Sequence, residues 1–489
     1  MVFNSIDFLV FFPIVTVIFF VIPKKARTLW LLIASYYFYM SWNPRYAVLI
    51  ALSTIITYAS GLLIEIFTKD RVKKLVMIAS LAGNLAILGI FKYADFALQT
   101  LSSVTSRLGL GTVDKRLDLL LPVGISFYTF QALSYTLDVY RGAVKAEKSI
   151  IKYALFVSFF PQLVAGPIER SGNLLGQVQK IQEVKLWNFE RVRDGLLLML
   201  WGLFQKLVIA DRASILVNQV YGNCRQYGFL ELAVASILFA FQIYCDFGGY
   251  TDIARGAAQV MGFSLMHNFR QPYFALNIKD FWRRWHISLT SWFTDYLYIP
   301  LGGSRKGIAR QYVNIMIVFG ISGLWHGASW HFVAWGLLHA GYQIAGNLRE
   351  RVSQRAGEKA ADGVQVSFGR KLGKQIVTFA LVDFAWIFFA ADSLRQVYYI
   401  LRQMMTTFHT VGIYEMGLDQ GNWFMLLFGI CVLMIVDFVH ERKESVFLFV
   451  DRQAVCFRWS LYLGLIWCII LFGIYGVGYD SSQFIYFQF

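Results

Sequence analysis

The chain has 489 residues, of which 57% are hydrophobic and only 15% are charged, and its mean hydropathy is +0.52. Soluble domains carry about 25% charged residues, so the composition excludes a soluble globular enzyme and indicates an all-α polytopic membrane protein. The formal net charge is +15. The basic residues lie in loops between apolar runs, a pattern typical of cytoplasmic loops and not of a nucleic-acid-binding surface.

The first third of the chain is predicted to cross the membrane five times. A helical crossing needs roughly 20 apolar residues, and the candidates are residues 8–23, 29–40, 46–64, 75–91 and 119–140. Basic clusters follow the first, third and fifth runs, which predicts that these loops are cytoplasmic and that the N-terminus and the polar residues 100–118 lie outside. The first seven residues lack a basic n-region, so the first run is expected to be a retained helix and not a signal peptide.

Residues 153–168 are apolar but broken by Pro161, Gly166 and Pro167. Because basic residues stand on both sides of this run, a re-entrant pair of short helices is predicted here instead of a full crossing. Residues 195–210 and 229–245 are then predicted to cross outward and back.

From Asp246 to Arg310 the pattern changes, because glycine, proline and scattered arginine interrupt the apolar runs. Gly248 and Gly249 are expected to break the preceding helix, and short re-entrant or cytoplasm-facing helices are predicted after them.

Residues 311–348 contain no Asp, Glu, Lys or Arg across 38 positions, between Arg310 and Arg349. This length predicts two crossings in a hairpin with both basic ends on one side. His326 lies near its middle, and an ionisable side chain at this depth is costly and indicates a functional site.

The remaining chain predicts a cytoplasmic loop and three more crossings. Residues 349–374 hold seven basic and three acidic side chains; the crossings are at 375–391, 422–439 and 459–479, with an external amphipathic stretch at 392–421. Asp383 would be an intramembrane carboxylate that needs a partner. The total is about 11–12 crossings in a single integral-membrane domain, residues 1–489, made of N-terminal helices (1–117), a core (118–348), the loop (349–374) and C-terminal helices with an external tail (375–489).

A second histidine lies in an aromatic segment, Phe281-Trp282-Arg283-Arg284-Trp285-His286. If residues 281–293 form one helix, the tryptophans and His286 share a face, and the tryptophans are then best interpreted as interfacial anchors. For His286, a packing role and a functional role are equally compatible with the pattern.

His326 is flanked by Gly320, Gly323 and Gly327, which permit close backbone approach or an unwound turn. The alternative to a functional role is a buried histidine satisfied by a neighbouring carbonyl. His326 and His331 are five residues apart across a glycine, which is not the i, i+4 spacing of a helical zinc site, so no metal is expected. His331 could be an interface residue, and His339 is expected to pack between helices.

Asp246 and Asp252 lie at the expected break after residues 229–245. Capping of that helix end is the favoured interpretation, and orientation of a histidine is the alternative. A lone intramembrane histidine with no nucleophile beside it favours general base catalysis on a bound hydroxyl.

Several motifs together resemble the membrane-bound O-acyltransferases (MBOAT), in particular the bacterial alginate and peptidoglycan O-acetyltransferase branch. The histidine motifs are Trp282–His286 and Trp325-His326-Gly327, and further similar stretches are Ser126–Gln131, Phe160–Ile168, Tyr298–Gly303 and the ending Phe484–Phe489. The resemblance runs over nearly the whole chain.

This resemblance implies a ring of helices with a central tunnel in the bacterial inner membrane, in which His326 is the catalytic histidine and Trp325 an orienting neighbour. His286 matches the second signature position, where many eukaryotic members carry Asn, so a positioning role is expected there. The implied donor is acetyl-CoA, for whose phosphates Arg283, Arg284 and Arg305 are candidate contacts.

The resemblance also implies envelope partners: an extracytoplasmic SGNH-type acetyltransferase or other acylation components, with a cell-surface polysaccharide as final acceptor. Tyr486 in the aromatic tail is a candidate acyl relay, and docking of that tail on the membrane or on the partner is the equal alternative. Rival functions are a D-alanyl, lipid or protein O-acyltransferase of the same superfamily, and a transporter that makes no bond.

Overall fold

The computed structural model describes residues 1–111, 116–164, 166–185, 188–355 and 367–475, and these residues form helices joined by turns, with no strand among them. They belong to two compact units. The first holds residues 1–199 and 250–266, and the second holds residues 200–249 and the described chain from 267 onward.

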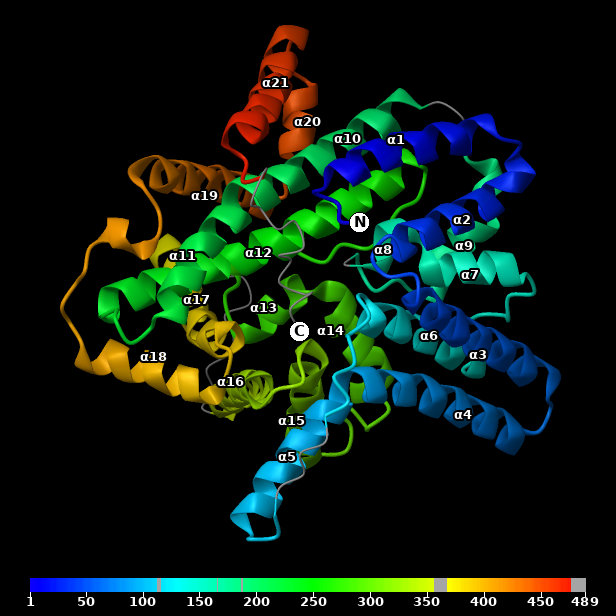
Figure 1. The fold of residues 1–489 in the computed structure, drawn as a ribbon, viewed down its shortest axis with the longest axis horizontal. Helices are drawn as coiled ribbons and strands as arrows, with labels where there is room; N and C mark the ends of the chain where they lie inside the picture. The colour runs from blue at the N-terminus through cyan, green and yellow to red at the C-terminus, as the bar shows by residue number, and fades with distance from the viewer. Residues whose placement is uncertain (112–115, 165, 186–187, 356–366, 476–489) are drawn as a thin grey trace. The chain divides into compact units, whose positions relative to one another are not determined.

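The helices of the first unit are mostly short, and two of them, α10 and α12, also contribute residues to the second unit. Their bounds are α1 (Ile6–Val21), α2 (Arg27–Met40), α3 (Tyr46–Ile66), α4 (Asp70–Leu88), α5 (Ala94–Arg107), α6 (Ile125–Tyr140), α7 (Ile150–Ser158), α8 (Phe160–Leu163), α9 (Gly176–Gln179), α10 (Phe189–Phe204) and α12 (Phe229–Val260). Helices α3 and α4 lie side by side, joined by a short turn (Figure 1).

The second unit contains the helices that carry both candidate histidines. Their bounds are α11 (Asp211–Gly222), α13 (Ile278–Arg284), α14 (Ile287–Phe293), α15 (Ile308–His326), α16 (Trp330–Arg355), α17 (Phe368–Ala390), α18 (Leu394–Thr406), α19 (Gln420–Glu441), α20 (Val446–Asp451) and α21 (Val455–Phe472). A π-helical turn, Gln205–Ala210, joins α10 to α11.

The protein is an all-α polytopic membrane protein. Within the described chain, six helices are long and apolar enough to cross a membrane: Tyr46–Ile66, Asp70–Arg107, Phe229–Val260, Phe368–Ala390, Gln420–Glu441 and Val455–Phe472. Each of them overlaps one predicted crossing, and the helix at the last crossing, 459–479, ends at Phe472. In the last of these only 6% of the most apolar window is buried in the protein, as expected for a helix that faces lipid. The larger predicted total stays a prediction.

Several helices extend beyond the predicted apolar runs into polar sequence. The external segment 100–118 is helical to Arg107, and the loop 349–374 is helical at both described ends. Arg, Glu, Gln and Lys are good helix formers, so a helix continues past its apolar part. The predicted crossing 119–140 instead begins its helix at Ile125, after Gly124 in a left-handed conformation (φ +75°).

The break predicted inside residues 153–168 is confirmed. Helix α7 ends at Ser158 and α8 is a separate short helix with a proline, Pro161, in its first turn, where the missing proline N–H costs no hydrogen bond.

The break predicted at Gly248 and Gly249 is wrong, because α12 continues through both residues to Val260. A Cβ atom on Gly249 would lie 2.6 Å from the Gly202 carbonyl oxygen. The glycines therefore allow two helices to approach closely, as small residues do between membrane helices, and do not end the helix.

Candidate active site

The predicted hairpin is present as α15 and α16, which pack against each other and are joined by Gly327–Ser329. The two backbones are in close contact: a Cβ on Gly323 would lie 2.2 Å from the Phe332 carbonyl oxygen, and one on Gly336 would lie 2.2 Å from that of Phe319. Neither helix is among the six candidate spans. The hairpin places His326 at the last residue of α15.

Aromatic side chains enclose His326, whose side chain is only 3% exposed. Its ring centroid lies 5.0 Å from that of Trp335 on α16, 5.2 Å from that of Phe389 on α17 and 5.0 Å from that of Trp325. Three helices therefore contribute to a buried, largely apolar site around one imidazole.

Residues 281–293 do not form the single helix that the sequence predicts. Helix α13 ends at Arg284, α14 begins at Ile287, and His286 between them has a left-handed backbone (φ +43°). Asn268 stabilises the break, because its carbonyl oxygen accepts from the Ile287 N–H at 2.9 Å and its side-chain oxygen accepts from the Ser288 hydroxyl at 2.6 Å. A non-glycine residue in this conformation costs about 1–3 kcal/mol and is typical of functional sites.

The tryptophans of this segment are not interfacial anchors. Trp282, Trp285 and Trp292 are 6%, 1% and 8% exposed, and Trp285 packs on Trp386 with ring centroids 5.0 Å apart. These rings therefore pack inside the protein and do not lie at a membrane surface.

The two histidines lie close together. Their ring centroids are 6.2 Å apart, and Trp325 contacts both rings, at 5.8 Å from His286 and 5.0 Å from His326. Phe247 of α12 also packs on His286, with ring centroids 4.7 Å apart. His286 is 1% exposed, so both imidazoles are buried in one aromatic cluster.

Asp246 does not cap a helix end, because it lies inside α12. It accepts a hydrogen bond from the Lys206 ammonium at 2.6 Å, and Asp211 lies 2.8 Å from the same nitrogen. All three side chains are at most 5% exposed. This ion-pair cluster fixes α12 beside the π-helical turn, one residue before the Phe247 that contacts His286.

Lys206 was not chosen as a candidate from the sequence, although its position in the sequence does mark it. It is an ionisable residue inside the predicted crossing 195–210, which by itself indicates a partner or a function. Asp252 likewise lies inside α12 instead of at its end, and pairs with Arg255 at 2.9 Å.

The three candidate donor contacts differ in availability. Arg284 is already engaged by Glu441 and Asp280, at 2.6 and 3.0 Å, whereas Arg283 and Arg305 are exposed. A phosphate that binds Arg284 would have to displace these carboxylates, whereas the exposed Arg283 and Arg305 are accessible from solvent.

The remaining polar candidates have structural partners. His339 packs between helices as predicted, accepting from the Trp282 indole N–H at 3.3 Å, and the His331 Nδ1 lies 3.0 Å from the Phe388 carbonyl oxygen. Asp383 accepts from the Ser236 hydroxyl at 3.0 Å, which the sequence could not identify as the partner. Tyr486 lies outside the described residues.

A buried imidazole at a helix end, with a second imidazole 6.2 Å away, can accept a proton from a hydroxyl while the other ring orients the second reactant. The described residues include no group of three or more His, Cys, Asp or Glu side chains arranged to hold a metal ion.

Comparison with known proteins finds the same family over this region. Residues 145–359, which include both histidines, match the membrane-bound O-acyltransferase family, MBOAT. The chain is 35% identical to a probable alginate O-acetylase of Pseudomonas aeruginosa over 435 residues, covering 88% of this chain and 80% of that protein. It is also 35% identical to a peptidoglycan O-acetyltransferase of Helicobacter pylori over 424 residues, covering 81% and 78%. A teichoic acid D-alanyltransferase of Bacillus subtilis is 27% identical over 254 residues, covering 48% and 60%.

Proposed function

We propose, because the chain belongs to the membrane-bound O-acyltransferase family, that it transfers an acetyl group from cytoplasmic acetyl-CoA across the bacterial inner membrane for O-acetylation of a cell-surface polysaccharide. That it is an acyltransferase rests on the family and on relatives named O-acetylase and O-acetyltransferase. The polysaccharide acceptor is inferred from the alginate and peptidoglycan in those names.

One observation carries the catalytic proposal: two buried imidazoles, 6.2 Å apart, meet in one aromatic cluster. His326 takes the proton of the acceptor hydroxyl, and the oxygen forms a bond to the thioester carbonyl carbon. The carbon–sulfur bond breaks, and the CoA sulfur leaves with the proton held by the imidazole. The partial negative charge at the C-terminus of α15 favours the transient imidazolium.

His286 has a positioning role in this mechanism. Its strained backbone directs the ring into the cluster beside His326, where an N–H can polarise the thioester carbonyl. The water-poor aromatic surroundings strengthen such a hydrogen bond and keep hydrolysis of the thioester slow.

The acetyl group is then passed outward. A relay through the phenol of Tyr486 to an extracytoplasmic SGNH-type acetyltransferase is one route, and direct transfer to the polymer is the other. With Tyr486→Phe, the relay requires that acetylation of external polymer stops and that release of CoA from acetyl-CoA falls with it, because the acetyl group has lost its acceptor hydroxyl. Unchanged polymer acetylation would exclude the relay.

The test of the whole proposal uses the full chain in lipid nanodiscs with acetyl-labelled acetyl-CoA. His326→Ala should lower CoA release and label transfer by about 10²–10⁴-fold, the usual contribution of a general base. His409→Ala is the matched control, because His409 is exposed and lies outside the cluster. Thermal unfolding should show that both variants fold.

Two outcomes would replace the proposal. Wild-type rates in His326→Ala would show that His326 is not the base. Label found on phospholipid instead of polysaccharide, or use of a D-alanyl donor in place of acetyl-CoA, would assign the protein to another acyl chemistry of the same superfamily.

A further inference from the structure

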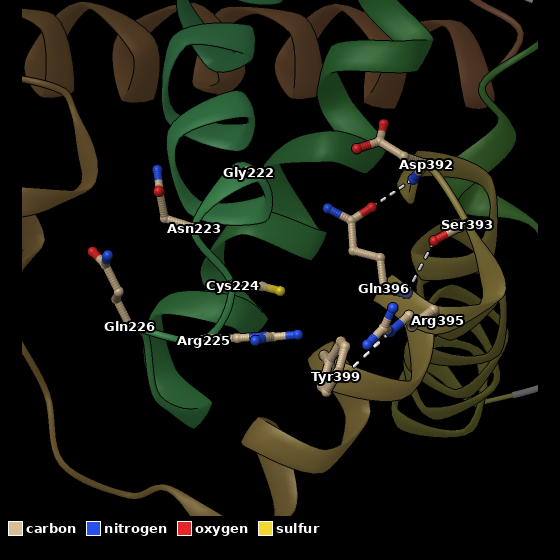
Figure 2. Close-up of a pocket in the computed structure, with 10 residues that line it drawn as sticks. All are labelled: Gly222, Asn223, Cys224, Arg225, Gln226, Asp392, Ser393, Arg395, Gln396 and Tyr399. Carbon is tan, nitrogen blue, oxygen red and sulfur yellow. Dashed lines mark hydrogen bonds between the residues drawn. The ribbon is translucent and has the colours of Figure 1, made fainter.

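A polar pocket of about 470 Å³ lies in the second unit, away from the histidine cluster. It is formed by the turn that follows α11 and by the beginning of α18, as Figure 2 shows. Its lining residues are Gly222, Asn223, Cys224, Arg225, Gln226, Asp392, Ser393, Arg395, Gln396 and Tyr399. This volume is in the range of small-ligand sites.

Two arginines from different elements meet at one tyrosine in this pocket. The Arg225 guanidinium lies 4.0 Å from the Tyr399 ring centroid, and the Arg395 Nε donates to the Tyr399 hydroxyl at 3.4 Å (Figure 2). Among the residues that the structure describes, no carboxylate forms an ion pair with either guanidinium. The pocket therefore presents two cations that no carboxylate pairs with directly and one carboxylate, Asp392, which together leave one net positive charge.

The arginines are held by a fixed framework. The Gln396 amide donates to the Tyr221 carbonyl oxygen at 2.9 Å, and the Gln403 amide donates to the Arg225 carbonyl oxygen at 2.6 Å. The Ser393 hydroxyl caps α18 by accepting from the Gln396 N–H. These bonds tie α18 to the turn after α11, so the pocket is formed before any ligand binds, which lowers the entropic cost of binding.

The charge pattern of the chain places this pocket outside the membrane. It lies where the spanning helix α17 ends, at Ala390, and just before the spanning helix α12 begins, at Phe229. The other end of α17 lies within residues 349–374, whose seven basic residues against three acidic ones predict a cytoplasmic side. The pocket is thus on the side where the acyl group is delivered.

The lining favours a hydrated, hydroxyl-rich ligand that carries one negative charge. Amides and a hydroxyl form much of the wall and no large aliphatic side chain is present in it, which is unsuited to a lipid chain. The guanidinium forks match a carboxylate. The carboxylate of Asp392 repels a dianionic phosphate more than a monoanionic carboxylate, and can accept hydrogen bonds from sugar hydroxyls.

We propose that this pocket binds the carboxylate of an acidic sugar unit of the acceptor polymer, with Arg225 and Arg395 as its contacts. The inference rests on the proposed function only for the presence of a polysaccharide acceptor. It adds a specificity site: polymers that carry uronic acid units are held at the external face, near the exit of the acyl group.

The test measures binding of a fluorescent uronic acid trisaccharide to the full chain in nanodiscs of zwitterionic lipid, with a neutral hexose trisaccharide for comparison. The uronate should bind and the neutral sugar should bind at least about tenfold more weakly, since a charged hydrogen bond contributes that much or more. Arg225→Gln and Arg395→Gln should each weaken uronate binding by about tenfold or more. Arg395→Lys should recover part of the loss, because it keeps the charge but not the fork.

Arg402→Gln is the matched control, because Arg402 is an exposed arginine of the same helix that does not line the pocket. The Arg402 charge reaches Tyr399 only weakly and through space, so this variant should weaken uronate binding much less than the two pocket variants. An equal loss in this variant would show that net charge, and not the pocket, attracts the sugar. Equal affinity for the neutral sugar would also overturn the proposal. Loss of uronate binding when anionic lipid replaces zwitterionic lipid would overturn it in favour of a lipid headgroup as the ligand.

Binding is measured without acetyl-CoA, so the two proposals fail separately. His326-dependent acetyl transfer together with absent uronate binding would overturn only the pocket assignment. Uronate binding without any transfer from acetyl-CoA would overturn only the proposed reaction. Thermal unfolding of each arginine variant should match that of the wild type, since both side chains are exposed.

Discussion

The imidazoles of His286 and His326 lie 6.2 Å apart, centroid to centroid, although 40 positions separate them in the chain. Two different local features bring them together. His326 is placed by the end of a tightly packed helix, α15, whereas His286 is placed by a left-handed residue between two short helices. This difference predicts that the two positions tolerate substitution differently.

His286→Asn should retain more acyl transfer than His326→Asn. Asn tolerates the left-handed backbone that His286 adopts and can still donate a hydrogen bond, but it cannot act as a base at neutral pH. We expect a loss of about 10²-fold or more only at position 326. The measurement is the rate of CoA release at saturating acetyl-CoA, with thermal unfolding as the fold control. Equal losses at both positions would contradict the assigned roles.

The hairpin makes a prediction about stability. Gly323→Ala and Gly336→Ala should each lower the free energy of unfolding by about 1–3 kcal/mol, because the added methyl group overlaps a backbone carbonyl of the facing helix. Gly341→Ala, in α16, is the control, since nothing lies within 4 Å of its Cβ position. That variant should be neutral or slightly stabilising. Thermal unfolding in one detergent compares all three; an unchanged midpoint in Gly323→Ala would refute the close contact.

Much of the hairpin could be predicted from the sequence, because a long run without charges has few structural solutions in a membrane. The glycines were harder to interpret. Gly248 and Gly249 look locally like a break, yet Gly249 serves a close helix contact that only the facing Gly202 explains, and Gly248 faces the Gln205 side chain. A glycine in a sequence does not distinguish these two uses, since both need only the absence of a side chain.

The two candidate histidines could be selected from the sequence, but the geometry that brings them together could not. His326 is marked by its flanking glycines and His286 by its neighbouring tryptophans, whereas the helix break at His286 depends on hydrogen bonds that Asn268, 18 positions earlier, accepts from Ile287 and Ser288. Tertiary interactions of this kind override a helical period. The aromatic enclosure by Trp335 and Phe389 comes from two further helices and has no local signal.

The buried cluster of Lys206, Asp211 and Asp246 predicts a large effect of one substitution. Lys206→Met should destabilise the protein by about 3–5 kcal/mol, because it leaves buried carboxylates without their cation. Replacing both aspartates by Asn in the same variant should recover much of the loss. Lys279→Met, at an exposed position, is the control. If Lys206→Met unfolds at the wild-type temperature, the cluster does not hold α12 in place.

The pocket lined by Arg225 and Arg395 predicts a pH dependence that depends on one phenol, that of Tyr399. The hydrogen bond from Arg395 and the positive charges of Arg225, Arg395 and Arg402 lower the pKa of Tyr399 from its usual value of 10. Because the folded-state pKa is depressed, the phenolate is favoured in the folded protein, and its charge appears as pH rises towards 10. Uronate carboxylates and guanidinium groups keep their charges over this range, so the new phenolate should repel the sugar and weaken its binding.

Titration of uronate affinity from about pH 7 to 10 should show this decline in the wild type and in Tyr398→Phe, but not in Tyr399→Phe. A decline of the same size in Tyr399→Phe would show that another group titrates and that Tyr399 does not lie beside the bound carboxylate.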